Sequence, residues 1–328
     1  MLSATYGAAG MGFIPRSSLS AHRLAYFHTV RWLSDQAVSR LRDVADRPDL
    51  TGTRYEIRRE IGRGGMGTVY EADDACLERP VALKVLTLES SDGALAERLL
   101  REARVMARLE HPGLVPVHDA GTLPDGRVFY AMKLVRGARL DEYAGKGSST
   151  ADRLAVFRKI CDTVAFAHAA GVLHRDLKPE NVMIGAYGEV LVLDWGVARR
   201  AEDPAEPKGT VLGTRAYMAP EQAAGRVDLV DERADVYSLG AILEDLLPEA
   251  PRPLRAISRK AKAPDPASRY ASVAALSDDV GRFLNGESPA AHRERPLERA
   301  GRFYRRYRIA ILLLLAYLAM RALLVALK

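Results

Sequence analysis

The sequence has 328 residues, of which 48 are Lys or Arg and 42 are Asp or Glu, so the formal net charge is +6. With 48% hydrophobic residues and mixed charge, the composition excludes a disordered or fibrous chain and suits about two globular domains. Cys76 and Cys161 lie far apart and neither belongs to a Cys-x-x-Cys pair, which disfavours a disulfide framework and a structural zinc site. A reducing compartment is the simpler interpretation.

Residues 1–50 are predicted to form an extension before the folded domain. Their Gly-, Ala- and Ser-rich start has no basic segment followed by a continuous apolar run, which disfavours a secretory signal. Between residues 21 and 44, apolar side chains recur at steps of three and four, which is typical of one amphipathic helix. Because its polar face mixes acid and base, we expect this helix to dock on the protein rather than lie on a membrane.

The hydrophobic period then changes, first to that of strands and later to that of helices. Alternating or β-rich runs occur at residues 55–61, 68–72, 80–86, 114–117 and 128–135. One helical pattern, residues 94–109, interrupts them and ends at His111-Pro112-Gly113. The sequence therefore predicts an α+β chain, in which a small lobe with an antiparallel sheet and one helix, residues 55–135, precedes a larger helical lobe, residues 136–285.

A glycine-rich segment, Gly62-Arg63-Gly64-Gly65-Met66-Gly67-Thr68-Val69, has the pattern G-x-G-x-x-G-x-V. Glycines let the backbone approach a polyphosphate closely and leave its N–H groups facing the oxygens. A dinucleotide-binding fold requires a helix directly after the glycines, whereas residues 68–72 have a strand pattern. We therefore interpret the segment as a hairpin over a nucleotide, and an ordinary tight turn is the alternative.

Lys84 follows in Val81-Ala82-Leu83-Lys84, on a strand that has the composition of a buried one. An unpaired ammonium would be costly there, so Lys84 requires a partner. Glu102, on the following helix, can supply a carboxylate, and the pair could hold the α- and β-phosphates of ATP. A purely structural salt bridge is the alternative for these two residues taken alone.

Three further motifs follow in order: His174-Arg175-Asp176-Leu177-Lys178-Pro179-Glu180-Asn181, Asp194-Trp195-Gly196 and Ala219-Pro220-Glu221. Together with the glycine-rich segment and Lys84, they resemble the protein kinase superfamily, in particular the bacterial eukaryotic-like Ser/Thr protein kinases, over residues 55–285. The resemblance implies a bilobal protein kinase fold, with a small antiparallel β-sheet lobe that carries one key helix and a larger α-helical lobe.

The resemblance also implies catalytic roles. Asp176 would orient the hydroxyl of the acceptor, and Lys178 would place a charge near the transferred phosphoryl group. Asn181 and Asp194 would supply hard oxygen ligands for Mg²⁺. The Lys-Pro-Glu-Asn form is typical of kinases that act on Ser and Thr. The resemblance implies a set of ATP-binding residues that also includes Lys84. They are Ile61, Gly62, Arg63, Gly64, Gly65, Met66, Gly67, Thr68, Val69, Lys84, Met132, Lys133 and Val135.

Two positions near the implied nucleotide differ from the family pattern. Trp195 replaces the usual Phe after Asp194, and it should keep Asp194 in place if the space between His174 and the helix of Glu102 is wide enough for the larger ring. Met132 resembles the residue at the back of the nucleotide pocket, and residues 133–135 resemble the hinge that reads adenine. Family members often have an acidic residue where Lys133 stands.

The segment between Asp194 and Glu221 implies regulation by phosphorylation. In the family, an Arg at the position of Arg175 binds a phosphate on this segment. Thr214 matches the residue that bonds the catalytic Asp and Lys, so Thr210 is the better phosphorylation candidate, and a mere loop hydroxyl is the alternative.

Three residues resemble structural anchors of the helical lobe. Asp235 matches the residue that holds the backbone of the catalytic loop, and Glu221 matches the partner of Arg269 in a buried ion pair. One departure is a short stretch after Gly240, where the helix that docks substrates and regulators in family members is missing.

The end of the chain predicts a membrane anchor. Residues 286–308 form a basic juxtamembrane segment, with seven Arg and two Glu between Arg293 and Arg308. Residues 309–327, interrupted by Arg321, span roughly 28 Å as a helix, close to the thickness of a bilayer core. Since basic clusters mark the cytoplasmic side, we expect a single-pass protein of the cell membrane with a cytoplasmic kinase domain. A buried or dimerising helix is the alternative.

The positive charge is gathered near this segment. Residues 252–308 carry a net charge of +8, whereas residues 1–251 carry −4. The charge therefore points to an anionic membrane surface and not to nucleic acid.

The function expected from these features is ATP- and Mg²⁺-dependent phosphorylation of protein Ser and Thr residues in bacterial signalling, with autophosphorylation and a possible homodimer for transfer in trans. A nucleotide-binding scaffold with weak or no catalysis is an alternative that only the short stretch after Gly240 favours. A small-molecule phosphotransferase is disfavoured by Ala219-Pro220-Glu221 and by the motif around Lys178.

Overall fold

The computed structural model describes residues 34, 47–64, 67–86, 93–144, 147–195, 198–200, 209, 213–294 and 296–326. The chain divides into residues 1–47 and residues 48–328, and the elements below belong to the second unit. The helix predicted for residues 21–44 lies outside the described residues, apart from Ser34, and so do Gly65, Met66 and Thr210.

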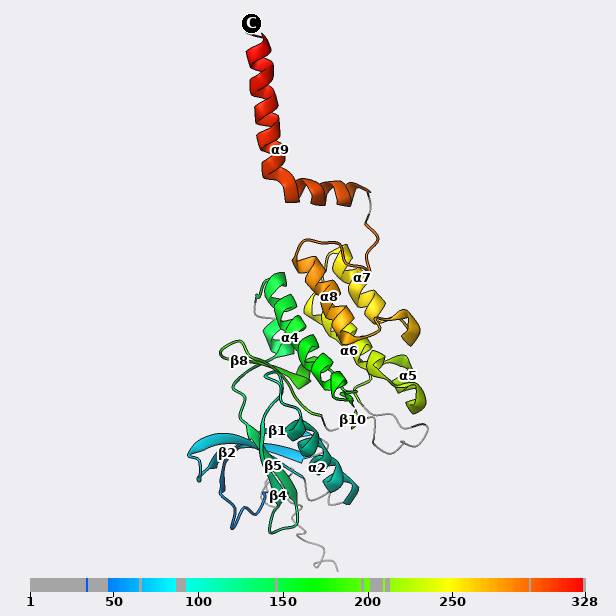
Figure 1. Ribbon diagram of the computed structural model, residues 1–328. Helices are drawn as coiled ribbons and strands as arrows, with labels where there is room; N and C mark the ends of the chain where they lie inside the picture. The colour runs from blue at the N-terminus through cyan, green and yellow to red at the C-terminus, as the bar shows by residue number, and fades with distance from the viewer. Residues whose placement is uncertain are drawn as a thin grey trace, which may run out of the picture. The chain divides into compact units, whose positions relative to one another are not determined.

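The small lobe is built on a five-stranded antiparallel sheet in the order β1-β2-β3-β5-β4 (Figure 1). Its strands are β1 (Tyr55–Gly64), β2 (Gly67–Asp74), β3 (Arg79–Val85), β4 (Val117–Thr122) and β5 (Val128–Lys133). Helix α2 (Gly93–Arg108) packs on β4 and β5. The predicted small lobe is confirmed in its elements, although the run at 114–117 only meets the start of β4.

Side chains alternate across the sheet, so each face buries its own cluster. Tyr130 and Leu99 belong to the cluster on the face that α2 covers, whereas Leu83 and Phe129 belong to the cluster on the opposite face. Lys84 directly follows Leu83, so its side chain leaves the sheet on the α2 face. The strand period therefore aims Lys84 at α2.

The larger lobe is mainly helical. Its helices are α3 (Leu140–Ala144), α4 (Thr150–Ala169), α5 (Pro220–Ala223), α6 (Glu232–Leu246), α7 (Arg252–Ala261) and α8 (Val273–Leu284), with short 3₁₀ turns at Pro179–Asn181, Val227–Leu229 and Pro266–Ser268. Strands β6 (Gly137–Arg139), β8 (Val182–Gly185) and β9 (Val190–Val192) form a small sheet, and β7 (Val172–Leu173) pairs with β10 (Arg199–Arg200).

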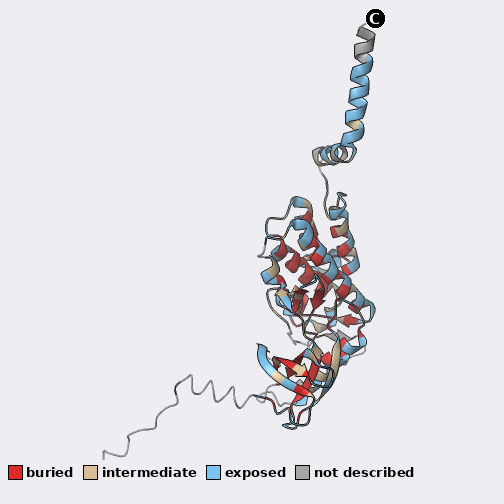
Figure 2. Ribbon diagram, turned by 90° about the vertical axis from the view of Figure 1, so that its left-hand side faces the viewer, coloured by how far each residue is buried: buried red, intermediate tan, exposed pale blue. Residues whose placement is uncertain are grey.

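Helix α4 lies at the centre of this lobe and packs against α8, α6, β7 and β9. A capping box starts it: the Ser149 hydroxyl accepts a hydrogen bond from the Asp152 N–H at 3.1 Å, and the Asp152 carboxylate accepts one from the Ser149 N–H at 3.2 Å. Figure 2 shows buried residues concentrated in the interior of the helical lobe and within the sheet of the small lobe. This core fixes the loops that follow β7 and β9.

Helices α6 and α7 are joined by residues 247–251 alone. The fully described stretch from residue 213 to residue 294 thus contains no helix between them, as the short sequence after Gly240 predicts.

Helix α9 (Pro296–Ala326) contains most of the segment that the sequence predicts to cross a membrane. Within the described part of the chain, no helix combines the length and the apolar character that a membrane crossing requires. The prediction of a transmembrane helix is therefore not borne out.

Candidate active site

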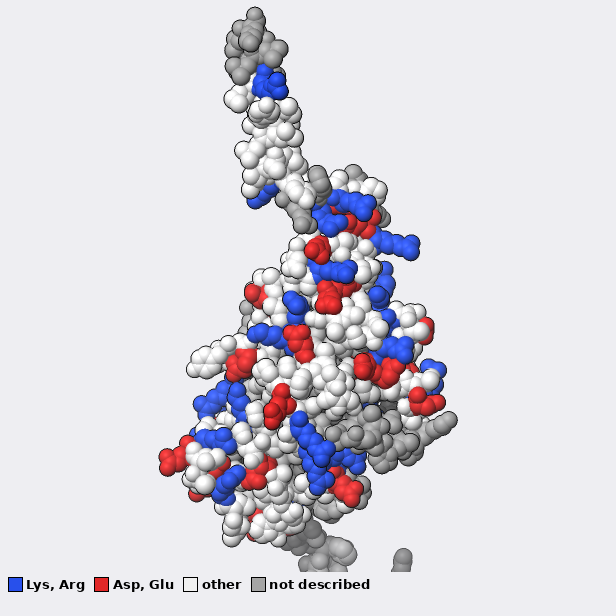
Figure 3. Space-filling view, viewed as in Figure 1, with Lys and Arg blue, Asp and Glu red and all other residues white. Residues whose placement is uncertain are grey.

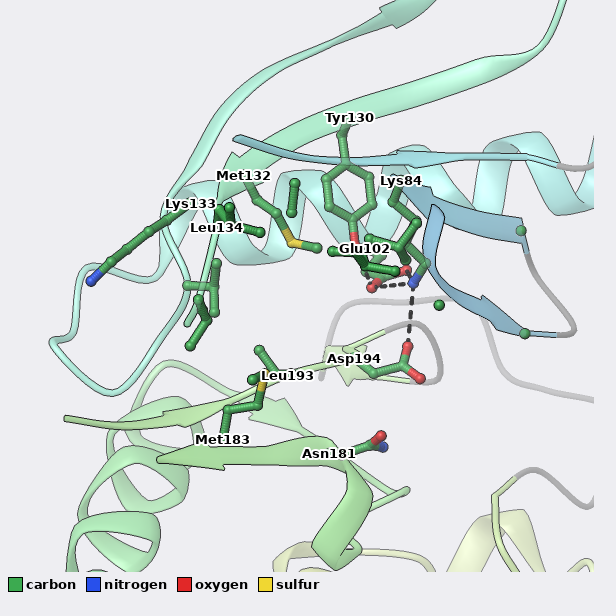
Figure 4. A pocket seen from close by; sticks show the side chains of 18 of the residues that line it. Lys84, Glu102, Tyr130, Met132, Lys133, Leu134, Asn181, Met183, Leu193 and Asp194 are labelled. Carbon is green, nitrogen blue, oxygen red and sulfur yellow. Dashed lines mark hydrogen bonds and ion pairs between the residues drawn. The ribbon is translucent and has the colours of Figure 1, made fainter. Parts of the chain in front are cut away.

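A cavity of about 490 Å³ lies between the sheet of the small lobe and strands β8 and β9 of the larger lobe (Figure 4). Its wall includes most of the predicted nucleotide-binding residues, together with both predicted metal ligands. The predicted residues that line it are Ile61, Gly62, Arg63, Gly64, Gly67, Val69, Lys84, Glu102, Met132, Lys133, Val135, Asn181 and Asp194. Thr68 does not line it, because its side chain alternates to the other face of β2 and is buried there.

The glycine-rich segment forms the β1–β2 hairpin, in which Gly64 pairs with Gly67. Gly67 has a φ of 151°, and a Cβ built there would lie 2.3 Å from the carbonyl oxygen of Val85, so only glycine fits. A Cβ at Gly62 or Gly64 would meet nothing within 4 Å. These two glycines therefore leave open space on the cavity side that a ligand can approach.

Lys84 and Glu102 form the predicted ion pair. The Lys84 Nζ lies 2.9 Å from each carboxylate oxygen of Glu102 and 3.4 Å from Oδ1 of Asp194. Burial alone would lower the pKa of Lys84, but the two carboxylates raise that pKa above its usual value. Lys84 is therefore a permanent cation in the cavity wall.

Asp194 faces the cavity from the loop after β9. Burial would raise the pKa of its carboxyl, yet Lys84 and His174 hold that pKa below the usual value, so the group is a carboxylate. Asn181 presents its amide on the same side of the cavity (Figure 4). The two residues offer oxygen ligands of the kind that Mg²⁺ prefers.

Asp235 anchors the loop that carries Asp176. Its carboxylate accepts hydrogen bonds from the N–H groups of His174, at 2.9 Å, and Arg175, at 2.8 Å, and lies 2.7 Å from the ring of His168. Burial would raise the pKa of Asp235, but His168 lowers it below the usual value. The predicted anchoring contact of Asp235 is thus present.

Asp176, Lys178 and Thr214 converge beside the cavity. Oδ1 of Asp176 accepts a hydrogen bond from the N–H of Thr214 at 2.7 Å, and Oδ2 lies 3.1 Å from the Lys178 Nζ. The Lys178 Nζ also donates to the Thr214 hydroxyl at 2.8 Å. Asn181, which lines the cavity, donates to the carbonyl oxygen of Asp176 at 2.9 Å. Thr214 contacts both predicted catalytic side chains.

Trp195 is accommodated without displacing Asp194 from the cavity wall. The indole is 1% exposed, its ring centroid lies 4.5 Å from that of His174, and it shares a core cluster with Met106 of α2. The space behind Asp194 is therefore wide enough for the larger aromatic ring.

Glu221 and Arg269 meet as the sequence predicts. Arg269 donates to both oxygens of Glu221, at 2.7 and 2.8 Å, and to three backbone carbonyls. Gln222, next to Glu221, donates to the carbonyl oxygen of Arg175 at 2.6 Å and so ties this region to the catalytic loop.

Several residues of the cavity wall were not predicted. They are Ala82, Met106, Val115, Tyr130, Arg139, Glu180, Met183 and Leu193. The period of β5 could have indicated Tyr130, because Tyr130 and Met132 stand two positions apart on one face of a strand. The side chain of Lys133, by contrast, points away from the cavity (Figure 4), so its backbone is what the residue brings to the wall.

The fold has a small β lobe, a mainly helical lobe and a cavity between them. That cavity brings together a glycine-rich hairpin, a Lys–Glu ion pair and two residues that offer oxygen ligands. This combination defines the protein kinase class. A comparison with protein families matches the protein kinase domain over residues 55–275. The chain belongs to the protein kinase family.

Curated relatives are serine/threonine-protein kinases of bacteria. PknD of Protochlamydia amoebophila is 34% identical over 299 residues, covering 71% of this chain and 30% of that protein. PknD of Chlamydia felis is 36% identical over 294 residues, covering 71% and 31%. PknH of Mycobacterium tuberculosis is 42% identical over 208 residues, covering 62% and 33%. The matches thus span about a third of the length of these relatives.

Proposed function

We propose that the protein is a serine/threonine protein kinase of bacterial signalling that transfers the γ-phosphoryl group of ATP to protein hydroxyls. The observation that carries this proposal is the setting of Asp176, whose carboxylate is held between the N–H of Thr214 and the ammonium of Lys178. A fixed carboxylate beside a nucleotide-sized cavity suits the orientation of an acceptor hydroxyl.

Four residues of the site have distinct roles in the proposed phosphoryl transfer. Asp176 orients the acceptor hydroxyl and takes its proton while the bond to the γ-phosphorus forms and the bond to the β,γ-bridging oxygen breaks, which leaves ADP. Lys178 stabilises the charge on the transferred group. Lys84 holds the α- and β-phosphates under the glycine-rich hairpin, and Glu102 keeps the ammonium in place.

Asn181 and Asp194 would hold Mg²⁺. When bound, Mg²⁺ neutralises part of the phosphate charge. Two protein ligands suit an ion that takes its remaining ligands from phosphates and water, and among the described residues no three His, Cys, Asp or Glu side chains gather into a metal site of their own.

The full chain and its Asp176→Asn variant, incubated with radiolabelled ATP, Mg²⁺ and a general protein substrate, test the proposal. We expect labelling by the wild type and at least a hundredfold less by the variant, of the order that general-base residues contribute. Equal labelling by both proteins would refute it.

A nucleotide-binding scaffold is a second candidate, and the short connection at residues 247–251 is the observation that favours it. A scaffold would not need the helix on which members of the family dock their substrates. Binding of ATP in a calorimetric titration, together with no phosphoryl transfer in the labelling assay, would support the scaffold.

Autophosphorylation in trans, within a homodimer, is proposed as the activating step. Arg175, beside Asp176, has the charge to bind a phosphate on the segment that contains Thr210. Phosphopeptide mapping of an active preparation should find Thr210 modified, and a fully active preparation without that modification would contradict the proposal.

Anchoring to the cell membrane through the C-terminal helix α9, with the kinase domain on the cytoplasmic side, is proposed as the location. Figure 3 shows basic side chains where α9 begins and mostly uncharged atoms along its later part. Leu312, Leu313 and Leu315 are among the apolar side chains of α9 that are exposed. Flotation with vesicles that contain an anionic lipid should carry the full chain upward, and a chain that stays in the bottom fraction would refute this attachment.

A further inference from the structure

Tyr130, in β5, contacts both members of the Lys84–Glu102 pair. Its hydroxyl donates a hydrogen bond to Oε1 of Glu102 at 2.8 Å, and the Lys84 Nζ lies 5.7 Å from the centre of its ring, within the range of a cation–π contact (Figure 4). The side chain is 1% exposed. Tyr130 is thus a fixed neighbour of the pair.

The sheet register determines this placement. Lys84 of β3 pairs directly with Tyr130 of β5, so both side chains leave the sheet on the face that α2 covers. The longer tyrosine ring passes beside Lys84 and reaches Glu102 on α2. Its hydroxyl therefore ties α2 to the sheet at the position of the ion pair.

The donors around Glu102 are fully engaged. Its buried carboxylate receives Lys84 on both oxygens, at 2.9 Å each, and Tyr130 on Oε1. The third donor of Lys84 faces Asp194 at 3.4 Å. Lys84 can therefore bind a phosphate oxygen only if one of its N–H groups turns away from a carboxylate.

We infer that Tyr130 is a positioning residue for nucleotide binding: its hydroxyl keeps Oε1 of Glu102 paired when Lys84 turns an N–H group toward a phosphate. Without the phenol, that turn would leave a buried carboxylate oxygen with one donor fewer, which is costly. The inference rests on the proposed function, because it assumes that the cavity binds ATP.

The phenol of Tyr130 remains a hydrogen-bond donor near neutral pH. Burial, and then the charge of Glu102, raise the pKa of Tyr130 well above its usual value. The phenol therefore keeps its proton near neutrality and can donate it to Glu102.

Tyr130→Phe in the full chain removes one oxygen and tests the inference by calorimetric titration with ATP and Mg²⁺. We expect about tenfold weaker binding, as the loss of a hydrogen bond to a charged group implies, and a matching rise in the KM for ATP. The KM for a protein substrate should not change. In a Lys84→Met background, Tyr130→Phe should have no further effect on ATP binding, because Tyr130 acts through Lys84.

Tyr270→Phe is the matched control. Tyr270 is also buried and donates to a carboxylate, Oδ2 of Asp279, at 2.7 Å, but it lies in the helical lobe and outside the cavity wall. We expect it to lower thermal stability without changing the affinity for ATP.

Unchanged ATP affinity in Tyr130→Phe would overturn the inference. So would a loss that persists undiminished in the Lys84→Met background, because Tyr130 would then act through general stability alone. A wild type that binds ATP but transfers no phosphate would refute the kinase activity and not the inference, since the titration measures binding directly.

Discussion

Glu221 and Arg269 form a bidentate ion pair, and neither side chain is more than 2% exposed. The pair joins the short helix α5 to the segment before α8, and Arg269 also donates to the carbonyl oxygens of residues 233, 263 and 264. One guanidinium therefore connects segments that are far apart in the sequence.

Arg269→Met should strongly destabilise the protein. It leaves the buried Glu221 carboxylate without its counter-charge, which costs about 3–5 kcal/mol. Denaturant unfolding measures the change in the free energy of unfolding. Arg233→Ala is the control, because the side chains of the Arg233–Asp231 pair are 36% and 45% exposed, and pairs open to solvent contribute less than about 1 kcal/mol. Similar losses in both variants would show that burial does not set the strength of the Glu221–Arg269 pair.

Gly67→Ala should impair both folding and nucleotide binding. The new Cβ would collide with the carbonyl oxygen of Val85, and the residue would have to keep a φ of 151°. A side chain at positive φ destabilises by more than about 1 kcal/mol. Gly126→Ala serves as a control that separates the two causes, because Gly126 has a φ of 84° but open space around it. If both variants lose equal stability, the contact with Val85 contributes nothing.

Trp195→Phe should lower stability while leaving most of the activity. The smaller ring leaves a cavity in a core that packs Trp195 against His174, at a cost of about 1–3 kcal/mol. Thermal unfolding measures that cost, and the KM for ATP reports on Asp194. A KM that rises more than about tenfold would mean that the indole itself places Asp194.

His168 and Asp235 predict how stability depends on pH. Burial lowers the pKa of His168, but Asp235 outweighs it and the pKa is raised above 6.5. The stabilisation by protonated His168 is therefore complete below pH 6.5 and is lost as the pH rises through the raised value. The difference in unfolding free energy between the wild type and His168→Asn should be largest below pH 6.5 and shrink as the pH rises above that value.

His118 provides the opposite case for the same measurement. Burial, and then Arg79, lower its pKa below 6.5, so protonation opposes folding. The wild type should therefore lose stability relative to His118→Asn as the pH falls. Slopes of the same sign for the two histidines would contradict one of the two assignments.

The elements of the small lobe could be predicted because its side-chain periods match its structure. Lys84 and Glu102 were predicted as a pair from the cost of burying a lone charge, and the register of the sheet places them together. Tyr130 could not be predicted as their partner, because that contact depends on which strand lies beside β3, and β5 is distant in the sequence. The direction in which the Lys133 side chain points could not be predicted either, because it depends on the face of β5 that lines the cavity and not on composition.

The end of the chain shows a limit of a different kind. Composition alone favoured a membrane crossing over residues 309–327, whereas none of the described helices combines the length and apolar character of a crossing. The helix itself was predictable, whereas the surroundings of its apolar side chains are not encoded in their spacing.

Arg175 and Asp194 both have left-handed backbone conformations, with φ values of 65° and 59°. Such conformations cost of order 1–3 kcal/mol each for residues other than glycine. Asp235 holds the N–H of Arg175, and Lys84 holds the carboxylate of Asp194, so two anchoring contacts oppose this strain. Part of the stabilisation from these contacts therefore maintains the geometry of the cavity rather than the fold. Selection for thermal stability alone would favour glycine at both positions, and the side chains proposed to take part in phosphoryl transfer would be lost.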